Sequence, residues 1–257
     1  MKIVIKVGTS TLAHKTGKLN IRRTDELCRV ISDLKNQGEE VILVSSGAIG
    51  MGVGKLGLKE KPQDIPTKQA AAAVGQCELM YTYDRLFTEY GHTVAQILLT
   101  GSDFTAEDRH ENFGNTMSRL SSLGALPIIN ENDTIATEEI KVGDNDTLSA
   151  LVAVSVKADL LVLLSDVDGL YSADPHKDTN AKLIERVHGI DQSILDLAGG
   201  EGSALGTGGM KTKLKAATMC NDSGIDMVIA NGENPAILYD IVSGKMGTYT
   251  RFFAKKA

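Results

Sequence analysis

The stretch IRRTDELCRVISDLKNQGEEVILVSSGA (residues 21–48) contains in one run the pattern that decides the fold of this chain. Residues 21–37 have the pattern of an amphipathic helix, and Gly38 is the kind of residue that commonly follows a last helical turn. The continuous apolar run VILV then predicts a strand that is buried on both faces of a sheet. We therefore expect a unit of helix, glycine, buried strand and small polar cluster, which here is SSGA.

The same unit returns four more times along the chain. The further helices are expected over residues 67–90, 103–123, 146–157 and 212–223, the strands are VAQILLT, LPII, DLLVLLS and MVIA, and the polar clusters are GSD, NEND, DVDG and NGEN. Alternation of helices with buried strands predicts an α/β fold, a three-layer α/β/α sandwich around a mostly parallel sheet. The polar clusters follow the carboxyl ends of strands, where open α/β sheets bind ligands, so we expect a cleft at that edge.

Two segments depart from this unit. Residues 138–142 read as a short strand, and residues 174–182 form a polar loop. Neither resembles a linker between domains, so we expect a single domain over residues 1–257 with a lobe boundary near residue 158.

The composition of the chain is that of an ordinary globular protein, with 42% hydrophobic and 23% charged residues among 257. A net charge of −6 argues against nucleic-acid binding, and no apolar run approaches the roughly 20 residues of a membrane span. The three cysteines form no CxxC pair, so neither a disulfide framework nor a zinc site is indicated. We expect a soluble, reduced, cytoplasmic protein, and we assign no metal-ligating residue.

Three segments have features of anion binding. In the opening MKIVIKVGTST, Lys6 ends a predicted strand just before Gly8, where a lysine is either solvated or a handle for a phosphate. The small residues of SSGAIG (45–50) form either a plain tight turn or a loop whose backbone N–H groups approach an anion. GTGGMKTK (206–213) puts two lysines at the start of a helix, which is unfavourable for a cation unless an anion binds there too.

Acidic and amide side chains gather in two further segments, NEND (130–133) and GDND (143–146). Asp144 or Asp146 suits the N-cap of the helix that follows, or a role in a site, and these functions can coexist. Mg²⁺ takes few protein carboxylates and otherwise binds phosphates and water, so it fits such a site. Lysines, carboxylates and anion-binding loops are the parts that phosphoryl transfer requires.

Other phosphate and catalytic motifs fit less well. The chain contains no GxxxxGK[ST] motif, so it is not a P-loop protein. Residues 52–57 match GxGxxG but do not directly follow a strand, and we interpret them as a glycine-rich loop rather than a dinucleotide site. No nucleophilic serine with a histidine partner is evident.

Six motifs together resemble the amino acid kinase superfamily and, within it, the glutamate 5-kinase family: KVGTST, SSGAIG, INEND, IKVGDNDTLSA, SDVDGLYSADP and GTGGMKTK, in the order of that family. INEND with KVGDND is the most specific pair. The resemblance implies transfer of the γ-phosphoryl group of ATP, with Mg²⁺, to the side-chain carboxylate of L-glutamate. It also implies the product L-glutamyl 5-phosphate, the first intermediate toward proline, with glutamate bound in the amino-terminal lobe and ATP in the carboxyl-terminal lobe.

The resemblance also assigns residues to roles. Lys6 and Lys213 would be catalytic, stabilising the transferring group, and Asp146 would hold both lysines. Glutamate would be bound by Ser46, Gly47, Asn130, Asp133 and Asn145, and the nucleotide by Lys6, Gly8, Ser165, Asp166, Thr207, Gly208, Gly209, Met210, Lys211, Thr212 and Lys213. An attacking carboxylate is already ionised at pH 7, so this chemistry requires no general base.

The family also implies partners and regulation. Many members carry a carboxyl-terminal PUA domain, and we expect none in this chain. Feedback inhibition by proline is implied, near the glutamate site around residues 50–61, as is a homo-oligomer. Because an acyl phosphate is labile, we hypothesise a hand-off to glutamyl phosphate reductase.

Two alternatives remain at this stage. A kinase for N-acetylglutamate or aspartate is disfavoured by the acceptor residues Ser46, Asp133 and Asn145. A catalytically silent sensor of an amino acid or nucleotide is disfavoured because it would not need Lys6, Asp146 and Lys213 together.

Overall fold

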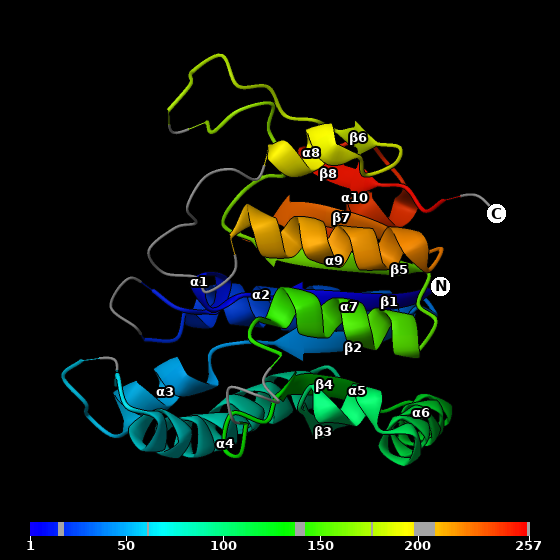
Figure 1. The fold of residues 1–257 in the computed structure, drawn as a ribbon. Coiled ribbons are helices and arrows are strands. Elements are labelled where there is room, and N and C mark those ends of the chain that lie inside the picture. The colour runs from blue at the N-terminus through cyan, green and yellow to red at the C-terminus, as the bar shows by residue number, and fades with distance from the viewer. Residues whose placement is uncertain (15–17, 61, 137–141, 176, 198–208, 256–257) are drawn as a thin grey trace.

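The computed structural model describes residues 1–14, 18–60, 62–136, 142–175, 177–197 and 209–255. Within them, one eight-stranded sheet runs through both halves of the chain, in the order β3-β4-β2-β1-β5-β7-β8-β6 (Figure 1). All pairs from β3 to β7 are parallel, whereas β8 is antiparallel to β7. The strands are β1 (Lys2–Val7), β2 (Glu40–Ser45), β3 (Val94–Leu99), β4 (Leu126–Glu131), β5 (Leu160–Ser165), β6 (Arg186–Val187), β7 (Asp226–Asn231) and β8 (Tyr249–Phe252).

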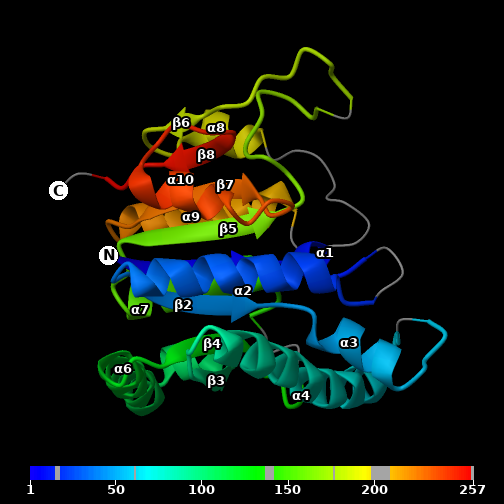
Figure 2. The same ribbon diagram turned by 180° about the vertical axis from the view of Figure 1, so that it is seen from behind.

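Helices cover both faces of this sheet, which confirms the predicted three-layer sandwich. They are α1 (Thr9–Leu12), α2 (Ile21–Asn36), α3 (Ala48–Lys55), α4 (Ile65–Glu89), α5 (Ser102–Thr105), α6 (Glu107–Ser122), α7 (Asn145–Ser155), α8 (Gln192–Asp196), α9 (Met210–Asp222) and α10 (Ile237–Ser243). Helices α6, α7 and α9 pack on one face, and α2, α4 and α10 pack on the other, as Figures 1 and 2 show from opposite sides.

Each face has its own hydrophobic core, because neighbouring residues of a strand point to opposite sides. In β1, Val4 belongs to the core beneath α7 and α9, and Ile3 and Ile5 belong to the core beneath α2. Strands β4 and β5 are buried along their whole length, as their apolar runs predict. The edge strand β3 is only half-buried, so the prediction of burial on both faces is wrong there.

The clearest difference from the predicted helices is a break near residue 106. Residues 103–123 form two helices, α5 and α6, because Ala106 has an extended backbone with φ −84° and ψ 116°. After α7, the turn into β5 is made without glycine, by Lys157 at φ 52°. The predicted strand over 138–142 lies outside the described residues except for Val142, which is in no strand.

The segment that the sequence indicates as a glycine-rich loop is the helix α3, which packs along α4 (Figure 2). A Cβ atom on Gly52 would lie 1.8 Å from the carbonyl oxygen of Ala71, and one on Gly75 would lie 1.7 Å from that of Ala48. These glycines therefore let the two helix backbones touch. The GxGxxG match reflects helix packing and not a dinucleotide loop.

Across the described residues, no helix is both long and apolar enough to cross a bilayer.

Candidate active site

The polar clusters that follow the strands meet at one edge of the sheet, as the fold predicts. Lys6 lies level with Val44 of β2 and Leu163 of β5, one residue before β1 ends. On the same face, α7 and α9 lie side by side and bring Asp146 and Lys213 to this edge (Figure 1). Three segments that are far apart in sequence thus supply one group of charges.

Lys6, Asp146 and Lys213 form what we call the lysine–aspartate cluster. The Nζ atom of Lys6 lies 2.7 Å from Oδ1 of Asp146, and Nζ of Lys213 lies 3.1 Å from Oδ2. All three residues are buried, with exposed fractions of 8%, 1% and 4%. Thr212 donates a hydrogen bond of 2.9 Å to the same carboxylate. Two cations share one anion out of water, so the cluster retains a positive charge that suits an anionic ligand.

The charge state of Asp146 follows from these contacts. Burial raises the pKa of this carboxyl, but the attraction of Lys6 and Lys213 and the hydrogen bonds from Lys6 and Thr212 outweigh it. The pKa of Asp146 therefore lies below its ordinary value, and the residue is ionised at neutral pH.

Asp144 and Asp146 divide the two functions that the sequence leaves open. Asp144 is the N-cap of α7, and its carboxylate accepts hydrogen bonds of 2.7 and 2.9 Å from the backbone N–H and hydroxyl of Thr147. Because Asp144 caps the helix, Asp146 in its first turn is left to face the lysines.

Ser46, Asn130 and Asn145 meet beside the lysine–aspartate cluster, on the side of β2 and β4. The side-chain Nδ2 of Asn145 donates to Oγ of Ser46 at 2.7 Å and to Oδ1 of Asn130 at 3.0 Å. Gly47, next to Ser46, has φ +106°, a backbone conformation that residues other than glycine rarely adopt. Asp133, also assigned to glutamate from the sequence, is half-buried in the turn after β4.

Gly8 has an unexpected structural basis. Its φ of −82° is open to any residue, so backbone conformation does not require glycine. A Cβ atom here would lie 3.5 Å from Nζ of Lys6. Glycine thus keeps free the space beside the lysine ammonium.

Part of the predicted nucleotide set lies at the end of β5 and at the start of α9. Ser165 donates to its neighbour Asp166 at 3.1 Å, and Gly209 is the N-cap of α9. Met210 is half-buried and Lys211 exposed at the start of that helix. Thr207 and Gly208 lie outside the described residues.

Sequence reasoning missed a hydrogen-bonded group at the same edge. Asp168 accepts hydrogen bonds of 2.9 Å from both Asn231 and Tyr171, which joins the ends of β5 and β7. The signal was available in the clusters DVDG and NGEN, which both follow strands.

A cavity of about 390 Å³ opens between the two halves of this edge. It is lined by Ser46 and Gly47 on one side and by Asp166 on the other, with Thr9 and Ser10 between them. The hydroxyls of Thr9 and Ser10 directly follow Gly8 in the sequence, but no role was assigned to them from the sequence. The lining also includes Arg23 and Glu233, which form an ion pair of 3.5 Å, and Leu12, Ala13, His14, Leu19, Asn20, Gly50 and Met51.

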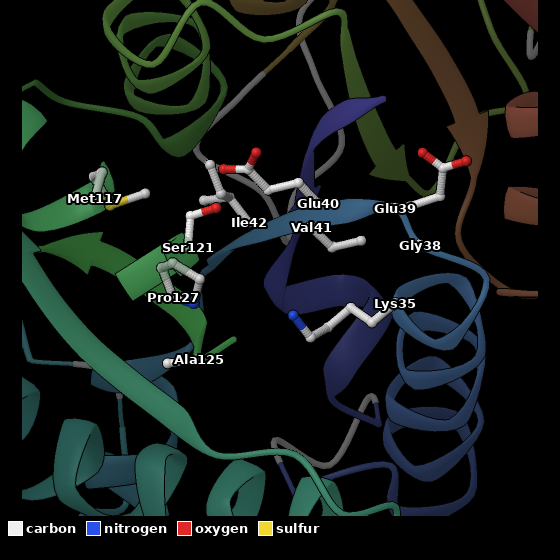
Figure 3. Close-up of a pocket in the computed structure, with 10 residues that line it drawn as sticks. All are labelled: Lys35, Gly38, Glu39, Glu40, Val41, Ile42, Met117, Ser121, Ala125 and Pro127. Carbon is white, nitrogen blue, oxygen red and sulfur yellow. The ribbon is translucent and has the colours of Figure 1, made fainter. Parts of the chain in front are cut away.

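A second cavity, of about 210 Å³, lies at the opposite edge of the sheet, where β2 and β4 begin (Figure 3). These two strands pair only through Leu43–Ile128 and Val44–Ile129, and Pro127 has no N–H to extend the ladder. The cavity thus lies where few residues of β2 and β4 are paired, and its lining includes no member of the lysine–aspartate cluster and none of Ser46, Asn130 and Asn145.

The described residues contain no group of three acidic, histidine or cysteine side chains that could hold a metal. Both oxygens of Asp146 already face lysines. This donor set fits a Mg²⁺ ion that arrives on the phosphates of a nucleotide, since Mg²⁺ needs few protein ligands.

Comparison with known proteins identifies the family of this chain. The sequence profile of the amino acid kinase family matches residues 1–231. Over 249 residues the chain is 54% identical to the glutamate 5-kinase of Caldanaerobacter subterraneus subsp. tengcongensis, covering 96% of this chain and 67% of that protein. Over 242 residues it is 55% identical to that of Clostridium acetobutylicum, covering 94% and 91%.

Solved structures of other kinases share the fold. A UMP kinase from Ureaplasma parvum superimposes with a TM-score of 0.67 at 16% identity, over 98% of both chains. A carbamate kinase from Giardia lamblia bound to AMP-PNP gives a TM-score of 0.69 at 15% identity, over 99% of this chain and 98% of the other. At such low identity these likenesses establish the fold alone.

Proposed function

Because the chain belongs to the amino acid kinase family, among the glutamate 5-kinases, we propose that its lysine–aspartate cluster stabilises the phosphoryl group as it passes from ATP to glutamate. The protein is an ATP-dependent kinase that phosphorylates the side-chain carboxylate of L-glutamate, a step of proline biosynthesis. The observation that supports the catalytic role most directly is the sharing of one buried carboxylate by Lys6 and Lys213.

The chemical obstacle in this reaction is repulsion between anions. The attacking carboxylate and the phosphates of ATP are all negative at neutral pH, so no proton needs to be removed. Lys6 and Lys213 reach the reacting group from β1 and α9, and Asp146 keeps both ammonium groups in place before substrates bind. Preorganised charges of this kind stabilise a transition state without reorganising, which is the main source of catalysis in phosphoryl transfer.

The atoms that Asn145 and Ser46 can offer to glutamate follow from the hydrogen bonds that these residues already make within the protein. Oxygens of Ser46, Asn130 and the Ser45 backbone surround Nδ2 of Asn145. Asn145 therefore meets glutamate through its Oδ1 atom, which accepts from a donor such as the ammonium group. Ser46 accepts from Asn145 and keeps its own hydrogen to donate to a carboxylate. Asp133 adds a negative charge for the same ammonium.

Mg²⁺ bound to the phosphates of ATP would neutralise part of their charge. The nucleotide would lie against Ser165, Asp166 and the start of α9, and the glutamate against the residues of β2, β4 and α7. This arrangement divides the domain into an acceptor lobe up to about residue 158 and a nucleotide lobe beyond it, across one continuous sheet.

Regulation and partners form the remaining part of the proposal. Proline, which shares an α-carboxylate and a positively charged nitrogen with glutamate, would bind at or near the glutamate site, around residues 50–61. We further propose that the protein is a cytoplasmic homo-oligomer that passes its labile product to glutamyl phosphate reductase. Inhibition by proline that rising glutamate relieves would support the overlap of the two sites, and inhibition independent of glutamate would contradict it.

The test of the function is trapping of the acyl phosphate as a hydroxamate. Mg-ATP is supplied with L-glutamate, N-acetylglutamate or L-aspartate in parallel. A signal with glutamate alone is expected. A signal with another acid would change the substrate and keep the kinase, and no signal from folded protein that binds ATP would favour the sensor.

A further inference from the structure

We propose that Gln76 is a positioning residue for the glutamate site, acting through Asn130 and Asn145. This inference rests on the proposed function of those two residues. Gln76 lies on α4, is only 7% exposed, and has no signal in the sequence that marks it as functional.

Gln76 belongs to a continuous chain of hydrogen bonds, which we call the amide chain: Gln96, Gln76, Asn130, Asn145 and Ser46. Its Oε1 atom accepts from Nδ2 of Asn130 at 3.0 Å, and its Nε2 atom donates to Oε1 of Gln96 at 3.0 Å. Asn130 in turn accepts from Asn145, which donates to Ser46. The amide chain therefore runs from the exposed Gln96 on the edge strand β3 to the proposed glutamate site.

The direction of the amide chain is fixed by backbone groups, which cannot exchange donor for acceptor. The backbone N–H of Glu131 donates to Oδ1 of Asn130 at 2.9 Å, so the atom that Asn130 turns toward Gln76 is the donor Nδ2. The backbone carbonyl of Ser45 accepts from Asn145 at 3.3 Å, which gives the same sense at the other end. Gln76 must therefore present an acceptor to Asn130.

That acceptor matters because Asn130 is 3% exposed and water has little access to it. Without Gln76, the amide Nδ2 of Asn130 would be a buried donor with no partner, a state that proteins avoid. Turning the amide would not help, because Oδ1 of Asn130 would then leave the backbone N–H of Glu131 and Nδ2 of Asn145. Loss of Gln76 therefore leaves Asn130 less firmly held, and with it the acceptor that holds Asn145. The orientation of Asn145, and with it the acceptor offered to glutamate, depends on a residue that does not line the cavity.

The packing of α4 keeps Gln76 in place. The preceding residue, Gly75, lies against the backbone of Ala48, in the helix that starts directly after Ser46 and Gly47. Helix α4, which carries Gln76, is thus packed against helix α3, which directly follows Ser46 and Gly47.

The test compares three variants of the full chain in steady-state kinetics and in glutamate binding by calorimetry. Gln76→Leu removes the acceptor at nearly constant volume. Gln76→Glu keeps an acceptor for Asn130, and the exposed Gln96 can turn its amide to face the new carboxylate. Gln96→Leu removes the outer partner only.

We expect Gln76→Leu to raise KM and Kd for glutamate about tenfold with KM for ATP within about twofold of wild type, since only one substrate contacts the chain. Gln76→Glu, which keeps the acceptor for Asn130, should stay closer to wild type than Gln76→Leu. Gln96→Leu, which leaves Nε2 of Gln76 without its partner, should raise the glutamate constants by a smaller factor than Gln76→Leu. The inference is overturned if Gln76→Leu leaves glutamate binding unchanged, if Gln76→Glu is as impaired as Gln76→Leu, or if both KM values rise together. If the wild-type protein binds glutamate without turnover, the proposed function is contradicted. The Kd values of the variants for glutamate would still test the role of Gln76.

Discussion

The lysine–aspartate cluster and the amide chain lie at the same edge of the sheet, but they are built on different physics. The cluster places charges from β1, α7 and α9 around one carboxylate. The amide chain consists of neutral groups, and its order depends on which atom of each pair donates the hydrogen bond. Charges attract over distance in any orientation, whereas neutral hydrogen bonds weaken steeply when misaligned.

This difference teaches how one edge can treat two anionic substrates differently. Under the proposed function, the lysines supply the strong, non-directional attraction that a phosphate site needs. The amides and the hydroxyl supply the directed donors and acceptors that a site needs to select glutamate among similar acids. Changes in the two regions should therefore fail in different ways.

The largest expected effect is on stability, from Asp146→Asn. This change leaves Lys6 and Lys213 buried without a counter-charge and should lower the free energy of unfolding at pH 7 by about 3–5 kcal/mol. Because the folded-state pKa of Asp146 is lowered, its contribution is present above the unfolded pKa of about 4 and is lost as pH falls through the folded value. Urea unfolding from pH 7 to pH 3 should thus show the difference between wild type and variant shrinking.

The matched control is Asp240→Asn, which breaks an exposed ion pair with Lys245 of 3.1 Å, the same length as the Lys213–Asp146 pair. We expect it to change stability by less than about 1 kcal/mol. Equal effects of the two substitutions would mean that burial does not set the strength of the lysine–aspartate cluster.

The next effect is on rate, from Lys213→Met. Loss of one preorganised charge should lower kcat in the hydroxamate assay by about 10²–10³-fold. Lys215→Ala, an exposed lysine on the same helix, should remain near wild type. A kcat of Lys213→Met near that of Lys215→Ala would remove Lys213 from the catalytic group.

A smaller effect is expected from Gly75→Ala, which tests the frame of the amide chain. The new methyl would meet the backbone of Ala48, and overpacking of this kind costs about 1–3 kcal/mol. Gly114→Ala, in α6 with open space around it, should be neutral or stabilise the helix by up to about 1 kcal/mol. Thermal unfolding of both variants tests this, and a stable Gly75→Ala protein would show that α3 and α4 can separate freely.

The smallest effect is expected from Ser46→Ala, which removes one directed hydrogen bond. KM for glutamate should rise about tenfold while KM for ATP stays near wild type, because the hydroxyl meets one substrate only. A fall in kcat with unchanged KM for glutamate would instead assign Ser46 to the phosphoryl group, on the charged side of the comparison.

The order of helices and buried strands could be predicted because the spacing of apolar residues within each segment indicates its secondary structure. The same holds for Lys6 and for the polar clusters, since every strand of a parallel sheet ends at the same edge. The errors arose where tertiary contacts override local pattern. Helix α3 looks like a loop until Gly52 and Gly75 are seen to let it touch α4, and the break at Ala106 has no glycine or proline to mark it.

The sequence by itself determined the α/β class, the edge of the sheet at which the polar clusters gather and, through its motifs, the family. The family resemblance assigned Asp146 to the two lysines, but only the tertiary structure decided that Asp144 is the helix cap and that both lysines contact the Asp146 carboxylate. It also revealed Gln76, a glutamine in an alanine-rich helix whose partner lies 54 residues away. The physical reason is that hydrogen-bond direction and shared charge depend on which atoms meet in space, and local periodicity contains no such information.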